Sequence, residues 1–138
     1  MPKVFSLEFK VRDYEVDMFG VVSNAAYLNY LEHARHEFLH GIGIDPAEIA
    51  VAGRALALSK INVHYQSPLR SREHFRVEAT IGELRGARVA IDQRIVSQPE
   101  GRPVLRARAV AVFLDERGRP LRISEPHRAA LLPYLVEP

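Results

Sequence analysis

Residues 23–40, SNAAYLNYLEHARHEFLH, decide the fold. When successive residues are turned by about 100°, the large apolar side chains of this stretch gather on one broad face of a helix. Ser23 or Asn24 can cap the start of the helix, and Gly41 can cap its end. A helix of this length must bury its apolar face against another large element. That face consists of Tyr27, Leu28, Leu31, Ala34, Phe38, Leu39 and Ile42.

Most of the remaining chain alternates apolar and polar residues, which indicates strands. In residues 74–84, for example, Phe75 and Val77 fall on one face and Arg76 on the other. Hairpin-length turns make the later strands antiparallel. The sequence therefore predicts an α+β fold, with a curved antiparallel sheet wrapped around one long central helix, as a single domain over residues 1–138. Strands are expected at 4–12, 55–66, 74–84, 88–97 and 104–115, a loop at 13–22, a connector with a helical turn at 45–53 and a short helix near 125–132.

The composition excludes several classes of protein. Of 138 residues, 47% are hydrophobic and 26% charged, and no run of about 18 apolar residues indicates a transmembrane helix. The start of the chain lacks the apolar segment of a signal peptide, and the absence of cysteine excludes disulfides and thiolate chemistry. We therefore expect a cytoplasmic protein that binds neither membrane nor nucleic acid. Most basic residues are arginine, which suits an anionic ligand or an acidic partner but also follows from a genome rich in Arg codons.

The stretch HEFLH, from His36 to His40, matches the H-E-x-x-H pattern of zinc peptidases. On the helical wheel both histidines lie away from the apolar face, so they point away from the core. The downstream histidines, His64, His74 and His127, form no recognisable third-ligand motif. We therefore expect no metal, and a solvated helix face whose histidines lie near the negative end of the helix dipole. A weak surface metal site or a subunit contact stays open as the alternative.

Upstream of the helix, Asp17 precedes a loop with Gly20 that runs into the helix start. A helix N-terminus offers unpaired N–H donors and partial positive charge, which stabilise the oxyanion formed when a carbonyl is attacked. A nearby carboxylate acts as a nucleophile or deprotonates water. Gly20 lets a ligand approach the backbone closely. This pairing suits acyl transfer or hydrolysis, although the sequence alone also allows Asp17 to cap or solvate a turn.

The run VRDYEVDMFGVVSNAAYLNYLEHARHEFL, residues 11–39, resembles the N-terminal signature of hot-dog-fold acyl thioesterases of the 4-hydroxybenzoyl-CoA thioesterase type. It is most similar to the branch that contains plant and cyanobacterial acyl-carrier-protein thioesterases and the methylketone-synthase thioesterases. A second stretch, VHYQSPLRSREHFRVEA at 63–79, resembles the Tyr-x-x-Pro segment that precedes the sheet meander in this family. The matching residues of the first run are Asp17, Gly20, Val21, Val22, Asn24, Tyr27, Tyr30 and Arg35.

The resemblance implies a thioesterase that hydrolyses fatty acyl or 3-oxoacyl groups carried by acyl-carrier protein or CoA, without a cofactor. Asp17 matches the catalytic acid of the family, and the backbone amide near Asn24 matches the donor to the oxyanion. Apolar residues after the glycine would line the acyl site, and arginines near the channel mouth would bind the CoA phosphates, although solvated charges on a turn explain these arginines as well. The residues expected to bind substrate are Gly20, Val21, Val22, Tyr27, Arg85, Arg88 and Arg128.

The resemblance also implies a homodimer, and beyond it a homotetramer, with active sites at the dimer interface. Two helices would lie side by side and two sheets would join, which hides sheet edges. Arg35 falls on the apolar side of the helix, so we expect a salt bridge across the dimer, or a pairing with Glu32 three residues earlier. His64 is expected to be packed or hydrogen-bonded within the sheet.

Three other functions stay open. A non-catalytic acyl-thioester-binding protein would keep the fold and the pocket, although the presence of Asp17 argues against it. A hot-dog dehydratase or hydratase needs a positioned histidine and an acid, and no histidine lies at the helix start. The zinc peptidase is the weakest of the three.

Overall fold

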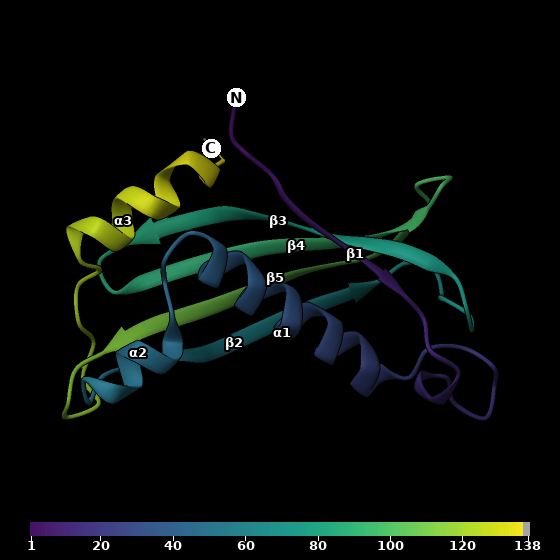
Figure 1. Ribbon diagram of the computed structural model, residues 1–138, viewed down its shortest axis with the longest axis horizontal. Helices are drawn as coiled ribbons and strands as arrows, with labels where there is room; N and C mark the ends of the chain where they lie inside the picture. The colour runs from purple at the N-terminus through teal and green to yellow at the C-terminus, as the bar shows by residue number, and fades with distance from the viewer. Residues whose placement is uncertain (137–138) are drawn as a thin grey trace.

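The computed structural model describes residues 1–136, so the last two residues of the expected domain lie outside the described part. Figure 1 shows one long helix lying across a curved sheet, which confirms the expected α+β fold. The helices are α1 (Asn24–Gly41), α2 (Pro46–Val51) and α3 (Glu125–Leu131), with 3₁₀ turns η1 (Asp13–Glu15) and η2 (Leu132–Tyr134). The strands are β1 (Phe5–Lys10), β2 (Ala55–Tyr65), β3 (His74–Arg85), β4 (Arg88–Gln98) and β5 (Pro103–Leu114).

The strands of the described chain form one antiparallel sheet in the order β1-β3-β4-β5-β2. β3, β4 and β5 follow one another as hairpins, as their short turns predict. β1 and β2 occupy the two edges, because β1 pairs only with β3 and β2 pairs only with β5. The expected strands and helices are confirmed, with boundaries that differ by a few residues.

The apolar face of α1 is buried against the sheet, as the helical periodicity predicts. Leu31, Ala34 and Phe38 have exposed fractions of 0%, and they recur at the spacing of one helix face. Leu28 belongs to the same predicted face but keeps 38% of its surface exposed. The apolar face of α1 is therefore wider than the part that this chain covers.

The residues that cap the two ends of α1 differ in part from those expected from the sequence. Ser23, rather than Asn24, caps the start, since its Oγ accepts a hydrogen bond from the Ala26 N–H at 3.2 Å. The helix runs through Gly41, so the prediction that Gly41 is the terminating cap is wrong. The left-handed residue that ends the helix is Gly43, with φ of +86°.

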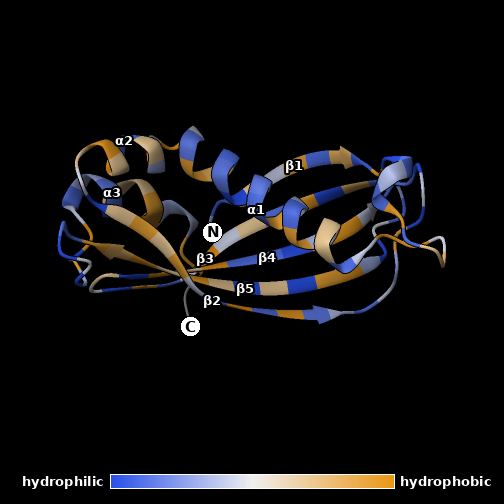
Figure 2. Cartoon of the chain, turned by 90° about the horizontal axis from the view of Figure 1, so that it is seen from below, coloured by the Kyte–Doolittle hydropathy of each residue, from blue (hydrophilic) through white to orange (hydrophobic). Residues whose placement is uncertain are grey.

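The core has two halves, which follow one another along α1. Under the first half of the helix, the ring of Tyr30 lies 4.7 Å from that of Phe75 on β3, and Phe9 of β1 stacks on Phe75 at 5.0 Å. Under the second half, Phe38 packs with Ile81 and its neighbours. Figure 2 shows apolar and polar residues interleaved along these elements. Packing along its whole length fixes the start of α1 at one end of the sheet.

Phe38→Ala tests this packing. Phe38 is fully buried, and its ring lies 5.3 Å from that of Phe5 and 4.8 Å from that of Tyr134. We expect the substitution to lower the free energy of unfolding by about 3–5 kcal/mol, measured by chemical denaturation. Val51→Ala is the control, because Val51 is 90% exposed, and it should change stability by less than about 0.5 kcal/mol. Equal, small effects of the two substitutions would contradict the placement of Phe38.

Candidate active site at the start of the long helix

A short hairpin leads from η1 into α1. Val16 and Val22 pair as an antiparallel bridge, and the Asp17 N–H donates to the Val21 carbonyl at 2.8 Å. On its other side, the Val22 N–H donates to the Leu69 carbonyl at 2.8 Å. The hairpin is therefore tied to the segment that precedes β3, next to the helix start.

Asp17 begins the turn of this hairpin. Its Oδ1 accepts a hydrogen bond from the Phe19 N–H at 2.8 Å, and its carbonyl accepts one from the Gly20 N–H at 3.0 Å. Gly20 has φ of +77°, a conformation that favours glycine, so the glycine is required by the turn itself. The Asp17 side chain is exposed in a single chain. Its second carboxylate oxygen has no hydrogen-bond partner among residues 1–136.

The first amide groups of α1 are incompletely paired. The Ala26 N–H donates to the Ser23 Oγ, and the Tyr27 N–H donates to the Ser23 carbonyl at 3.2 Å. Within the described residues, no acceptor is found for the N–H groups of Asn24 and Ala25. These donors carry the partial positive charge of a helix start. They are available for the oxyanion-binding role that we predict for the amide near Asn24.

A pocket of about 300 Å³ lies where the hairpin, the first turn of α1 and the end of β2 meet. The structure brings three of the predicted substrate residues together here. Tyr27 is held firmly, because its hydroxyl accepts a hydrogen bond from the Leu69 N–H at 2.9 Å. Burial raises the pKa of Tyr27 above its ordinary value, so the phenol stays neutral. The lining residues are Val21, Val22, Tyr27, Tyr65, Gln66, Ser67 and Pro68.

Tyr65 is a site residue that the sequence analysis missed. Its hydroxyl donates to the Asn24 Oδ1, and its ring lies 5.7 Å from that of Tyr27. The Tyr-x-x-Pro pattern, from Tyr65 to Pro68, was the available signal. That pattern indicates a turn after a strand. It does not indicate a contact with a residue 41 positions earlier in the chain.

The arginines expected to bind phosphates lie elsewhere. Arg85 and Arg88 flank the β3–β4 turn and Arg128 lies in α3, at the opposite end of the sheet from the hairpin (Figure 1). Arg88 also forms an ion pair with Glu83, with Nε and Oε1 3.7 Å apart. One chain therefore does not assemble the full set of predicted substrate residues.

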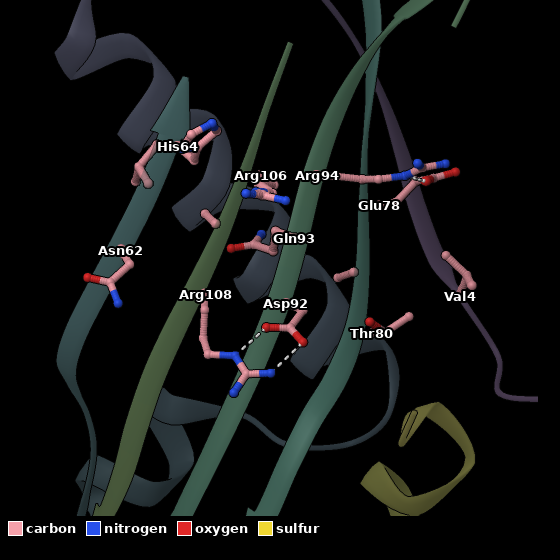
Figure 3. A pocket seen from close by; sticks show the side chains of 13 residues that line it. Val4, Asn62, His64, Glu78, Thr80, Asp92, Gln93, Arg94, Arg106 and Arg108 are labelled. Carbon is pink, nitrogen blue, oxygen red and sulfur yellow. Dashed lines mark hydrogen bonds and ion pairs between the residues drawn. The ribbon is translucent and has the colours of Figure 1, made fainter. Parts of the chain in front are cut away.

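The outer face of the sheet carries a larger groove, of about 700 Å³ (Figure 3). Its base carries ion pairs between neighbouring strands, such as the two hydrogen bonds of 2.7 and 2.9 Å from Arg108 to Asp92. Such cross-strand pairs stabilise a sheet. None of the predicted site residues lines this groove, and α1 lies on the other face of the sheet. The groove is therefore separate from the candidate site.

His64 lies on this outer face, with an exposed side chain. It is a sheet residue that pairs with Arg106 of β5, but the prediction that its side chain is packed or hydrogen-bonded is wrong, since within the described residues the imidazole is exposed and has no hydrogen-bond partner. The reason is its position on β2, an edge strand whose outer face is not covered by any element among residues 1–136.

The histidines of HEFLH are exposed, as the helical wheel predicts. His36 and His40 lie on the uncovered side of α1, and His33 instead approaches Glu37, with Nε2 and Oε1 3.8 Å apart. Residues 1–136 contain no group of three or more His, Cys, Asp or Glu side chains placed to hold a metal ion. The zinc-peptidase interpretation therefore gains no support from the structure.

Comparison with known proteins shows the family to which the chain belongs. The family model described as the thioesterase-like superfamily matches residues 11–133. The chain belongs to this superfamily. The chloroplastic acyl-acyl carrier protein thioesterase ATL3 of Arabidopsis thaliana is 45% identical over 135 residues, which cover 98% of this chain and 71% of that relative. The long-chain acyl-CoA thioesterase FadM of Escherichia coli is 30% identical over 109 residues, 78% of this chain and 81% of FadM.

Solved structures show the same fold for this thioesterase-like chain. Slr0204, a 1,4-dihydroxy-2-naphthoyl-CoA thioesterase from Synechocystis, superposes with a TM-score of 0.88 at 20% identity, covering 94% of this chain and 96% of Slr0204. The hot-dog fold and the family resemblance expected from residues 11–39 and 63–79 are confirmed. The comparisons do not assign the individual site residues, whose roles stay predictions.

Tyr27→Phe tests the anchoring of the pocket wall. The substitution leaves the buried Leu69 N–H without its acceptor, so we expect a loss of about 1–3 kcal/mol in the free energy of unfolding. Tyr14→Phe is the matched control, because Tyr14 is 78% exposed. Denaturant unfolding of both variants measures the difference, and equal stabilities would show that the Tyr27 hydroxyl does not hold the pocket wall.

Proposed function

We propose that this chain hydrolyses acyl thioesters, with fatty acyl or 3-oxoacyl groups carried by acyl-carrier protein or CoA. The observation that carries the proposal is the meeting of three features at the start of α1: a hairpin that bears a carboxylate, two unpaired amide N–H groups and a pocket lined with apolar and aromatic side chains. Relatives named as thioesterases support the reaction, ATL3 for a carrier-protein substrate and FadM for a CoA substrate.

In the proposed reaction the pocket holds the acyl chain, and the thioester carbonyl oxygen accepts hydrogen bonds from the N–H groups of Asn24 and Ala25. The Asp17 carboxylate deprotonates a water molecule, which attacks the carbonyl carbon. The amides stabilise the negative charge that develops on the oxygen. The C–S bond then breaks, the thiolate takes the proton from Asp17, and the free acid leaves. In the alternative route, Asp17 attacks the carbonyl itself and the C–S bond breaks to release the thiolate. Water then hydrolyses the resulting anhydride, which frees the acid, restores the Asp17 carboxylate and supplies the proton that the thiolate takes up.

We further propose that a homodimer completes the site. β2 is an edge strand, which offers unpaired backbone groups. Large apolar side chains on and beside it are exposed, with exposed fractions of 38% for Leu28, 50% for Leu58 and 49% for Tyr65. Pairing of β2 with its copy about a two-fold axis would cover these side chains and lay α1 beside its copy.

This dimer also accounts for the distant arginines. Because the paired β2 strands run antiparallel, the β3–β4 turn of one chain falls at the same end of the joined sheet as the helix start of the other. Arg85, Arg88 and Arg128 then lie at the end of the sheet where the partner's pocket opens. In this arrangement they are placed to meet the phosphates of a CoA or carrier-protein substrate.

Asp17→Asn tests the catalytic role of the carboxylate. The amide keeps the shape of the side chain but cannot take a proton, so we expect kcat/KM for acyl-CoA to fall by about 100-fold or more in a thiol-release assay. Asp13→Asn is the matched control, since Asp13 is an exposed aspartate four residues earlier, and it should retain near-normal turnover. Unchanged turnover of Asp17→Asn would rule out this assignment.

Leu58→Glu tests the dimer. A charge at the centre of the proposed interface cannot be buried without a partner, so we expect a monomer in light scattering and a loss of hydrolysis. Leu132→Glu, at a residue that is 44% exposed in η2, should leave both the mass and the turnover unchanged. A dimer that persists in Leu58→Glu would show that the subunits meet elsewhere.

A second candidate is a protein that binds acyl thioesters without hydrolysing them. It is favoured by one observation, because Asp17 is exposed and is not among the residues that line the pocket of a single chain. Binding of acyl-CoA without thiol release would establish this second function.

Two further expectations stay predictions. One is the association of dimers into a homotetramer, and the other is a cytoplasmic location. In the described part of the chain, no helix has the length and the apolar character needed to cross a membrane.

A further inference from the structure

The buried charge of Arg35 has no role in the reaction described above. Arg35 is only 8% exposed, although it lies on α1 in the middle of the helix. Burial lowers the pKa of Arg35 below its ordinary value, while the nearby Glu32 raises it. A guanidinium nevertheless stays charged at neutral pH. Enclosing such a charge is costly unless its donors find acceptors.

One acceptor is present within the chain. The Arg35 Nη1 donates to the Gln93 Oε1 at 3.0 Å. The Gln93 Nε2 in turn donates to the Leu31 carbonyl on α1 at 2.9 Å. Gln93 lies between Ala79 and Ala107 on the neighbouring strands, whose small side chains leave room for it. The glutamine therefore fixes the orientation of the guanidinium, but it supplies a neutral acceptor to only one of its nitrogens.

The other Arg35 donors have no acceptor in the described part of the chain. A guanidinium carries five N–H groups, and Glu32 does not come within ion-pair distance of Arg35 among residues 1–136. No fully enclosed side-chain nitrogen or oxygen of the described residues lacks a partner. The remaining Arg35 donors are therefore not sealed in the core, and they face a space that another molecule can reach.

That space is a cavity of about 100 Å³ between α1 and the strands β2 and β5, which Arg35 lines. Its walls are mainly aliphatic, and Leu58, which is 50% exposed, stands at the uncovered edge of β2. The cavity thus combines aliphatic walls with the charged N–H donors of Arg35, whose orientation Gln93 fixes. Its aliphatic walls include Leu39, Leu56, Leu58, Ile91, Ala109 and Ala111.

The cavity lies along the same side of the molecule as the candidate active site. Both it and the pocket at the helix start are lined by residues of α1 and β2, with Tyr65 at one end of β2 and Leu56 near the other. Arg35 follows Asn24 by eleven residues, which places them about 16 Å apart along the helix axis. That separation is comparable to the length of a medium- to long-chain acyl group.

We propose that the Arg35 cavity receives the far end of the acyl chain and selects chains that carry a neutral hydrogen-bonding oxygen, such as a hydroxyl or oxo group, near that end. This inference rests on the proposed thioesterase function, and it assigns Arg35 as a specificity-determining residue. A chain that ends in a methyl group would displace water from the Arg35 donors without replacing its hydrogen bonds, whereas an oxygenated end replaces them.

The lining of the cavity favours this occupant over a carboxylate from a second copy of the chain. A carboxylate side chain gains little from aliphatic walls, and it would meet the negative charge of Glu32, which also lines the cavity. A hydrocarbon chain with a neutral oxygen near its end suits both the walls and the donors.

The test compares acyl-CoA substrates of equal length with the unmodified protein. The three probes end in a methyl group, a hydroxyl group and a carboxylate, and each chain is long enough to span the helix from Asn24 to Arg35. We expect kcat/KM to be about tenfold higher for the hydroxyl end than for the methyl end, the effect of one hydrogen bond to a charged group. Equal values for these two probes, or a preference for the carboxylate alone, would overturn the inference.

Arg35→Met tests whether the Arg35 donors cause the preference for the hydroxyl-ended substrate. The methionine has a similar length without the donors, so the preference for the hydroxyl end should disappear while the methyl-ended substrate is still hydrolysed. Arg106→Met, at an exposed arginine on the outer face of the sheet, is the matched control and should keep the preference. Retention of the preference in Arg35→Met would also overturn the inference.

Failure of this inference differs from failure of the proposed function. If none of the three probes is hydrolysed, the thioesterase proposal fails. If all three are hydrolysed with equal kcat/KM, hydrolysis stands and the role of Arg35 fails. Should Arg35→Met not fold, the comparison of the three probes on the unmodified protein still decides whether the protein prefers an oxygenated chain end. A loss of the dimer in Arg35→Met, without any preference in the unmodified protein, would assign Arg35 to a subunit contact and overturn the inference.

Discussion

Burial of the apolar face of α1 against the sheet is the constraint on which the rest of the structure depends. Leu31, Ala34 and Phe38 are enclosed completely, so the helix has no freedom to slide or rotate over the strands. The same packing holds the start of α1 next to the end of β2, where Tyr65 donates to Asn24. Amide donors stabilise a developing oxyanion well only when their position is fixed before the substrate arrives. The packing of these three core residues thus fixes the position of the helix-start amides, although Leu31, Ala34 and Phe38 do not themselves contact the proposed substrate pocket.

Periodicity in the sequence predicts the helices and strands, because buried residues recur along the chain at the spacing that each kind of element imposes. The spacing of apolar residues gives α1, and the alternation of Phe75 and Val77 with Arg76 gives one face of β3. Contacts between distant residues leave no such pattern. The Tyr65–Asn24 hydrogen bond, the burial of Arg35 against Gln93 and the exposure of His64 depend on the order of strands in the sheet. The end of α1 shows the same limit at short range, since Gly41 and Gly43 both allow a helix end, and the structure uses Gly43, which is followed by the fully buried Ile44.

The proposed pairing of two chains along the edge strand β2 would account for three features of the single chain. Leu28 and Leu58 are exposed although they are large and apolar. The arginines of the β3–β4 turn, which are expected to bind the substrate phosphates, lie at the opposite end of the sheet from the Asp17 hairpin. Arg35 is buried with donors to spare beside a small cavity that β2 borders. A second chain paired along β2 would cover Leu28 and Leu58. It would also bring its own turn arginines to the end of the joined sheet where the first chain's pocket opens, and it would enclose the cavity beside Arg35. The thioester end of a substrate and its far end would then be recognised at two points of the same helix.

The most direct measurement of the central claim is the response of backbone amides to a non-hydrolysable acyl-CoA analogue, followed by NMR. If the start of α1 binds the carbonyl oxygen, the amide resonances of Asn24 and Ala25 shift strongly as the analogue is added, together with those of Val21 and Val22. Shifts confined to the outer face of the sheet, around Arg94 and Arg106, with the helix-start amides unchanged, would contradict it.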